Sequence, residues 1–208
     1  MKLAAAVAAA VALTLPATAS AGMIAFGSKL TAPANKIEAH PVDAVFWHKA
    51  FPNGRNVRAP ARGKVATIKL KGNVVRRGGV DPVTLFHFQI LHPQPDGKVQ
   101  VSLTSGPFHV PVGGDQNRIT TYHPINLCAK KGDWVAFNDV GGYKPGAYPN
   151  GSPFRIFSSV PNASTWFFSQ GGATNNHAIF KGSTHQGEEL LMRMVLLTGD
   201  DAGYCQNH

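Results

Sequence analysis

Glycine and proline interrupt this chain at short intervals, and that spacing limits what it can fold into. The 208 residues include 22 Gly and 15 Pro, well scattered, and runs of helix-forming residues are few. Between the interruptions apolar and polar side chains alternate, as where Phe86, Phe88 and Ile90 alternate with His87 and Gln89. Alternation with a period of two is typical of a strand with one buried face. The sequence therefore predicts an all-β protein made of short strands and turns.

Two further segments extend this prediction. Lys98–Ser102 repeats the alternation, and the Asp-Gly pair in the preceding Gln94–Gly97 predicts a hairpin turn. Leu190–Leu197 is nearly all apolar and fits a helix by periodicity alone, but its length and the all-β surroundings favour a central strand. About ten strands are expected in all, enough for two stacked sheets, so we predict a single antiparallel β-sandwich.

The first 21 residues have the pattern of a secretory signal. Lys2 precedes the apolar run Leu3–Leu15, Pro16 ends that run, and the small residues Ala19-Ser20-Ala21 follow. The apolar run is shorter than the roughly 20 residues that a membrane-spanning helix needs. We therefore expect a secreted or cell-surface protein, with a retained anchor as the alternative.

This interpretation divides the chain into three parts. Residues 1–21 are the expected signal peptide, 22–56 an extended N-terminal segment rich in Pro, Ala and His, and 57–208 the β-sandwich domain. No later hydrophobic segment is long enough for a transmembrane helix.

The chain has two cysteines, Cys128 and Cys205. In an oxidising compartment an even count favours a disulfide, which would tie the C-terminal tail to the middle of the domain. Two buried free thiols are the alternative. Neither cysteine has a second one at CxxC spacing, which argues against a zinc site.

The formal net charge is +9, and the positive charge is concentrated in one segment. Ala44–Val80 has no acidic residue, and it supplies the six residues of a predicted basic patch, namely Arg55, Arg58, Arg62, Lys64, Arg76 and Arg77. A one-sided positive field favours anionic partners such as cell-wall polymers, acidic polysaccharide or lipid head groups. A merely solvated basic face is the alternative. Nucleic acid is not expected, because no recognised reader motif is present.

Two long segments rich in Gly, Tyr and Asn, residues 138–153 and 169–187, are predicted to be loops. Loops of this length usually bind something or are disordered. Aromatic rings there can stack on sugar rings while their polar tips bond hydroxyl groups. The predicted ligand-binding residues are accordingly Tyr143, Tyr148, Asn150, Asn176 and His177, with simple loop packing as the alternative for the two tyrosines.

No metal or cofactor is expected from the sequence. The nine histidines form neither HxH nor HExxH. A structural calcium is the alternative, and Asp133, Asn138 and Asp139 come nearest to a ligand set, although Asp133 more readily bonds turn amides. No catalytic residue is predicted either, because GxSxG and GxxxxGK are both absent.

The segment Lys131–Phe137 places a Gly-Asp turn before alternating apolar residues. This arrangement resembles strand starts in jelly-roll and galactose-binding-like sandwiches. The chain also resembles, in outline, uncharacterised secreted actinobacterial β-sandwich proteins. The resemblance implies a jelly-roll or galactose-binding-like sandwich, and similar proteins in some cases bind carbohydrate and often carry a structural calcium.

These observations together predict a secreted, non-catalytic binding module for carbohydrate or an anionic cell-surface polymer. Two alternatives stay open at this point. One is an extracellular hydrolase or lyase acting on polysaccharide through a pair of carboxylates. The other is a structural envelope protein without a discrete ligand.

Overall fold

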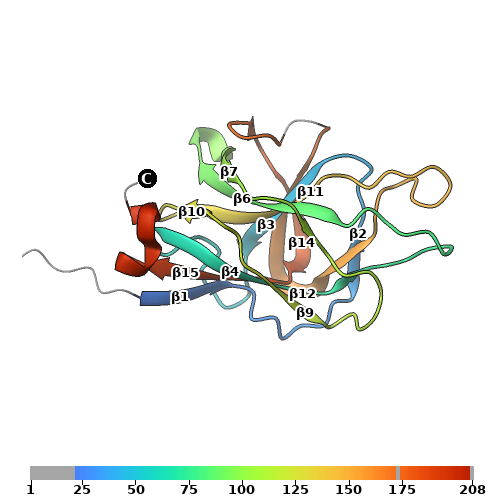
Figure 1. Ribbon diagram of the computed structural model, residues 1–208, viewed down its shortest axis with the longest axis horizontal. Coiled ribbons are helices and arrows are strands. Elements are labelled where there is room, and N and C mark those ends of the chain that lie inside the picture. Colours follow the sequence, from blue (N-terminus) through green and yellow to red (C-terminus); the bar gives the residue numbers. More distant parts are fainter. Residues whose placement is uncertain (1–21, 172–173, 207–208) are drawn as a thin grey trace, which may run out of the picture.

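In a computed structural model, which describes residues 22–171 and 174–206, the chain forms two antiparallel β-sheets packed face to face (Figure 1). The predicted all-β sandwich is confirmed. The signal-peptide prediction falls on residues 1–21 and so lies outside the described residues.

The smaller sheet has five strands. Its order is β1 (Gly22–Gly27), β15 (Met192–Thr198), β4 (Gly63–Lys71) and β10 (Cys128–Ala129), with β9 (Ile119–Tyr122) also paired to β4. The apolar closing segment is therefore a strand, as predicted, and β15 lies inside the sheet between β1 and β4. In Figure 1, β1, β15 and β4 run together in one layer.

The larger sheet has ten strands. Its main path is β13 (Ile179–Phe180), β7 (Val99–Thr104), β6 (Leu85–Pro93), β11 (Trp134–Asp139), β3 (Ala44–Ala50), β12 (Phe154–Ser169) and β14 (Ser183–Leu190). Three short strands join it at the side: β2 (Lys36–Glu38) and β5 (Asn73–Val74) pair with β12, and β8 (Phe108–His109) pairs with β6.

The predicted hairpin is formed by β6 and β7, which are antiparallel neighbours. The short 3-10 turn η1 (Pro95–Gly97) joins them, and Asp96 and Gly97 both have positive φ angles, of 63° and 70°. Asp and Gly adopt this left-handed conformation more readily than other residues, which explains the turn signal.

The predicted boundary at residue 57 does not separate two packed parts. Residues 22–56, expected to be an extended segment outside the sandwich, contribute β1, β2 and β3. β3 lies between β11 and β12, and Val45, Phe46 and Trp47 are all buried. A strand covered on both faces is apolar throughout and shows no alternation, so its sequence has no strand period to detect.

The main core lies between the two sheets. Large side chains of the ten-stranded sheet, such as Phe88 and Phe137, share one buried cluster with Ile68, Met194 and Leu196 of the five-stranded sheet. A second apolar cluster covers the outer face of the larger sheet, with Trp47, Leu91, Trp134 and Phe180 among its members. The central strands β3 and β11 of the larger sheet are therefore buried on both faces.

The predicted disulfide between Cys128 and Cys205 is present, with the two Cα atoms 5.2 Å apart. It joins β10 to the C-terminal 3-10 segment η2 (Gly199–Gln206). In Figure 1 this red segment lies at the end of the molecule where β1 begins, opposite the loop that follows β11.

Among the described residues, no helix has the length and apolar character needed to cross a lipid bilayer.

Candidate functional site

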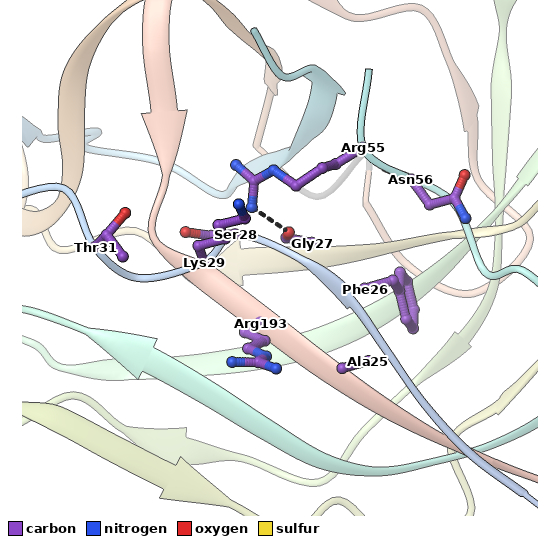
Figure 2. Close-up of a pocket in the computed structure, with 9 residues that line it drawn as sticks. All are labelled: Ala25, Phe26, Gly27, Ser28, Lys29, Thr31, Arg55, Asn56 and Arg193. Carbon is purple, nitrogen blue, oxygen red and sulfur yellow. Dashed lines mark hydrogen bonds between the residues drawn. The ribbon is translucent and has the colours of Figure 1, made fainter. Parts of the chain in front are cut away.

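A basic pocket opens where β1 ends and the chain turns toward β2. Its volume is about 490 Å³, which falls in the range of small-ligand sites. Nine residues line it (Figure 2): Ala25, Phe26, Gly27, Ser28, Lys29, Thr31, Arg55, Asn56 and Arg193. In this view Arg55 lies on one side of the chain at Gly27 and Arg193 on the other.

The pairing of β1 with β15 sets one wall of the pocket. Gly27 is opposite Arg193, and the neighbours Met192 and Met194 are buried, so Arg193 points outward. Gly27 has φ +86°, and a Cβ there would lie 2.7 Å from the Met192 carbonyl oxygen. A side chain at Gly27 would therefore force the two strands apart at the pocket.

Arg55 is held in place by three contacts. Its guanidinium lies 4.4 Å from the centre of the Phe51 ring, and its Nη1 donates to the Gly27 carbonyl oxygen at 3.3 Å. Its Nη2 is 3.9 Å from Oε1 of Glu189, a buried carboxylate that also accepts a 2.6 Å hydrogen bond from the Ser28 hydroxyl. A guanidinium fixed in this way loses little conformational freedom when it binds an anion.

The charge of the pocket is of one sign. Lys29, Arg55 and Arg193 line it, and none of the nine lining residues is acidic. Glu189 lies behind Arg55 and offsets one of the three positive charges. The remaining positive charge, next to the hydrogen-bonding side chains of Thr31 and Asn56, suits an anionic group that also carries hydroxyls.

The predicted basic patch is not one surface, since of its six residues only Arg55 lines this pocket. Arg58 stacks on Trp134. Arg62 donates to the Gln206 carbonyl, and Lys64 lies in β4. Arg76 pairs with Asp81, and Arg77 lines a separate hollow of about 350 Å³. Residues close in sequence are spread because turns and strand alternation send them to different faces.

Sequence reasoning missed Lys29 and Arg193 as binding residues. Arg193 had a usable signal, because it is the one charged side chain within the apolar run Leu190–Leu197. A single arginine in a core strand has to face solvent or pair with an acid. Lys29 had no comparable signal, since its place at the pocket depends on how β1 ends.

The prediction that Tyr148 offers a stacking face is wrong. Its side chain is 0% exposed, and its hydroxyl donates to the Val80 carbonyl at 2.6 Å and accepts from the Arg77 backbone N–H at 2.9 Å. The hydrogen bonds of Tyr148 therefore hold its own loop against the segment around residues 77–80. Tyr143 is 58% exposed and Asn150 is exposed, so a ligand contact by these two stays a prediction.

Asn176 and His177, the other two predicted ligand residues, are exposed and anchored to β7. The Asn176 side-chain oxygen accepts a 2.7 Å hydrogen bond from the Thr104 hydroxyl, and the His177 N–H donates to the Val101 carbonyl. The segment expected to be one long loop over 169–187 contains β13 and the start of β14. Ligand binding by Asn176 and His177 stays a prediction.

The three nearest candidates for calcium ligands do not form one set. Asp133 lies just before β11, where it accepts from the Lys130 N–H, as expected for a turn residue, and lies 2.7 Å from His92. Asn138 and Asp139 end β11, and as neighbours in a strand they point to opposite faces. Burial, together with the nearby Asp43, raises the pKa of Asp139 well above its usual value, and its Oδ1 atom accepts a hydrogen bond from the Gly141 N–H.

His92 and Asp133 also line a second hollow, of about 300 Å³, together with Ser102. An imidazole held by a carboxylate can serve as a general base. The Ser102 hydroxyl, however, donates to the Ile90 carbonyl at 3.2 Å, so it is engaged with the backbone. The arrangement supplies a His–Asp pair without an activated nucleophile.

No family model matches the chain, and comparison with the curated proteins and with the solved structures found no match. What the protein binds therefore has to be inferred from its side chains. The basic pocket offers fixed cations and hydrogen-bond donors, and none of its lining side chains is a carboxylate, histidine or cysteine that could transfer a proton near neutral pH.

Proposed function

We propose that this protein is a secreted, non-catalytic module that binds an acidic polysaccharide or a related anionic polymer through the basic pocket. The observation that carries the proposal is that Lys29, Arg55 and Arg193 line one hollow without an acidic partner among its lining residues. Arg55 is the anchor, because its contacts with Phe51 and the Gly27 carbonyl already orient it.

The surroundings of the pocket favour a polymer over a single small anion. Arg193 is directly opposite Lys69 on β4, and both side chains are exposed. The row of positive charge therefore continues from the pocket across the smaller sheet. A chain with regularly spaced carboxylates or sulfates can contact both parts, and each contact adds to the affinity.

The alternative of a polysaccharide hydrolase or lyase receives no support from this pocket. Glycoside hydrolysis generally needs two carboxyl groups on either side of the bond that is broken. Glu189, which lies behind Arg55, is buried and bonded to Ser28. A binding role is the function that the geometry favours.

The test is a binding measurement with polymers of different charge. Purified protein is titrated by calorimetry with heparin (sulfated), polygalacturonate (carboxylated) and dextran (neutral), at low ionic strength and at about 0.15 M salt. We expect binding to at least one charged polymer, weaker binding at higher salt, and none to dextran.

A pair of matched variants separates the pocket from the overall charge. Lys29→Gln/Arg193→Gln removes two positive charges at the pocket, while Lys98→Gln/Lys131→Gln removes two from exposed turns of the larger sheet. We expect the first variant to bind at least about tenfold more weakly and with a shallower salt dependence, and the second to bind as the wild type. Equal losses in both would show that only net charge matters and would contradict the proposal.

A further inference from the structure

A second group of titratable side chains lies away from the basic pocket, where β2 and β14 flank the long strand β12. Phe157 of β12 is paired with Lys36 of β2 on one side and with Leu190 of β14 on the other. Glu38 of β2 and two β14 residues, His185 and Glu188, come together there. We call these three residues the Glu–His cluster.

The spacing within the Glu–His cluster is that of ligands around a shared point. One side-chain donor atom of each residue lies within 4.8 Å of the other two. His185 Nδ1 is 3.5 Å from Glu188 Oε1 and 4.0 Å from Glu38 Oε1. Atoms that bind one zinc ion tetrahedrally at about 2.1 Å lie about 3.4 Å from each other. The His185–Glu188 separation is close to this value, the His185–Glu38 separation is somewhat longer, and both are too long for strong hydrogen bonds.

Glu188 is the member of the cluster whose buried negative charge most requires a nearby cation. Its side chain is fully buried, and within the described part of the chain its carboxylate is contacted by the side chains of Lys36 and His185 and not by backbone N–H groups. The Nδ1 atom of His185 is also buried, and it faces the Glu188 carboxylate. Glu188 is ion-paired with Lys36, which also lies 3.4 Å from Glu38. One ammonium group thus faces two carboxylates, and a buried carboxylate without full compensation is costly.

The neighbours of the cluster hold its members in position. The His185 ring stacks on Phe167 with ring centres 5.0 Å apart, and the His40 ring packs on the same phenylalanine at 4.5 Å. The His40 Nε2 atom is 3.5 Å from the second oxygen of Glu38. Groups that orient ligands in this way are common around metal sites.

We propose that Glu38, His185 and Glu188 bind one first-row divalent cation, for which zinc is the representative. Two carboxylates and one imidazole form a donor set of the kind that zinc takes when one position is left to solvent. Calcium and magnesium, which prefer oxygen donors alone, bind more weakly here. His40 is a positioning residue for Glu38.

Lys36 competes with the metal for the same carboxylates. Its side chain is about one third exposed, so its ammonium group can turn to solvent when a dication replaces it. The metal then joins β2 to β14 on either side of β12, a connection that the Lys36 ion pairs otherwise make. This competition distinguishes a metal site from a simple network of ion pairs.

The first test measures zinc directly. Protein made without a polyhistidine tag is treated with chelator, desalted, incubated with zinc chloride, desalted again and analysed for metal by atomic emission. We expect one tightly held zinc per chain in the wild type, and no comparable retention of calcium or magnesium. A wild-type chain that retains no zinc overturns the proposal.

Matched histidine variants locate the site. His185→Gln removes a ligand, whereas His123→Gln removes an exposed histidine outside the cluster. We expect zinc affinity to fall by about 100-fold or more in His185→Gln and to stay unchanged in His123→Gln. Circular dichroism checks that both variants are folded. Equal zinc binding by the two variants overturns the assignment.

The variant Lys36→Met provides the sharpest readout, because it removes the competing ammonium group while keeping a side chain of similar length. A metal site predicts tighter zinc binding and a larger rise in melting temperature on adding zinc than in the wild type. An ion-pair network predicts lower stability without any gain in zinc affinity, and that result contradicts the proposal.

Discussion

Glu188 and Glu189 are adjacent residues of β14 and both are buried, but their side chains lie in two different regions of the molecule. Glu188 is 0% exposed and faces the Glu–His cluster, and Glu189 is 6% exposed and lies behind the basic pocket. Adjacent side chains of a strand point to opposite faces of the sheet. One strand thus places the same chemical group in two different electrostatic settings.

The difference between the two settings lies in what surrounds each carboxylate. Glu189 accepts a hydrogen bond from Ser28 and lies near Arg55, on the side where three cations line the pocket. Glu188 shares its space with a second carboxylate, Glu38, with one lysine and with His185. The first region has excess positive charge and attracts anions, while the second has excess negative charge whenever His185 is neutral and attracts cations. The balance of neighbours, more than the residue itself, determines the role.

The largest expected effect is on the stability of the whole fold and not on either of the two regions. Cys128→Ser/Cys205→Ser opens a loop of 77 residues, and the chain-entropy model assigns to this a loss of up to about 4.5 kcal/mol. We expect a much lower urea midpoint, with polymer binding unchanged under conditions where the variant is still folded. Lost polymer binding in a folded variant would show that the pocket depends on the disulfide.

Removing the buried carboxylate tests whether the two regions are independent. Glu188→Ala leaves Lys36 and His185 without their main partner, and we expect a loss of about 3 kcal/mol in unfolding free energy by urea titration. Because Glu188 faces away from the basic pocket, affinity for the charged polymer should stay the same. If polymer binding is lost as well, the Glu–His cluster and the basic pocket act as one site.

His48 extends the comparison to pH. Its ring is buried, its Nε2 atom lies 2.7 Å from the Leu190 carbonyl, and burial, together with the nearby Arg55, lowers its pKa from 6.5 to about 4. The folded state therefore holds this histidine neutral, and the unfolded chain takes up the proton first as the pH falls. This contribution to stability is complete above pH 6.5 and is lost as the pH falls toward 4.

We expect His48 to make the wild type lose about 2 kcal/mol between pH 7 and pH 5. His48→Gln can still donate to the Leu190 carbonyl but does not titrate, so its stability should change by correspondingly less. Urea midpoints of both proteins at the two pH values give the difference. The same pH dependence in both proteins would mean that folding does not lower the pKa of His48.

The smallest expected effects compare two tyrosines of one loop. Tyr148→Phe removes the hydrogen bonds to the Val80 carbonyl and the Arg77 N–H, and we expect a loss of about 1.5 kcal/mol. Tyr143→Phe changes an exposed ring and should alter stability by less than about 0.5 kcal/mol. Thermal unfolding distinguishes the two, and equal effects would contradict the burial of Tyr148.

Much of the fold could be predicted because turn residues and alternation are local signals. The β6–β7 hairpin, the strand at Leu190–Leu197 and the disulfide all follow from residues that lie close in sequence or from a simple count. β3 could not be recognised in the same way, since both of its faces are buried and its apolar run does not alternate.

The candidate sites could not be predicted because they depend on which strands become neighbours. Arg55 and Arg193 meet at the pocket only through the pairing of β1 with β15, and Glu38 and Glu188 meet only because both their strands flank β12. The acid-free segment Ala44–Val80 suggested one patch, but its cations are distributed over several faces. Sequence proximity is a poor guide where strands reverse direction every few residues.

The pairing of β1 with β15 also sets the order in which the molecule can fold. Gly22 lies opposite Thr198, so β1, the first described strand, can pair only after β15, the last strand, is available. Such distant pairing is slow to form, and until then β4 has no neighbour at the place of β15. A growing chain can build the β6–β7 hairpin early, but the five-stranded sheet closes only after residue 198 has been made. The basic pocket, which needs Lys29 and Arg193 together, forms at that last step.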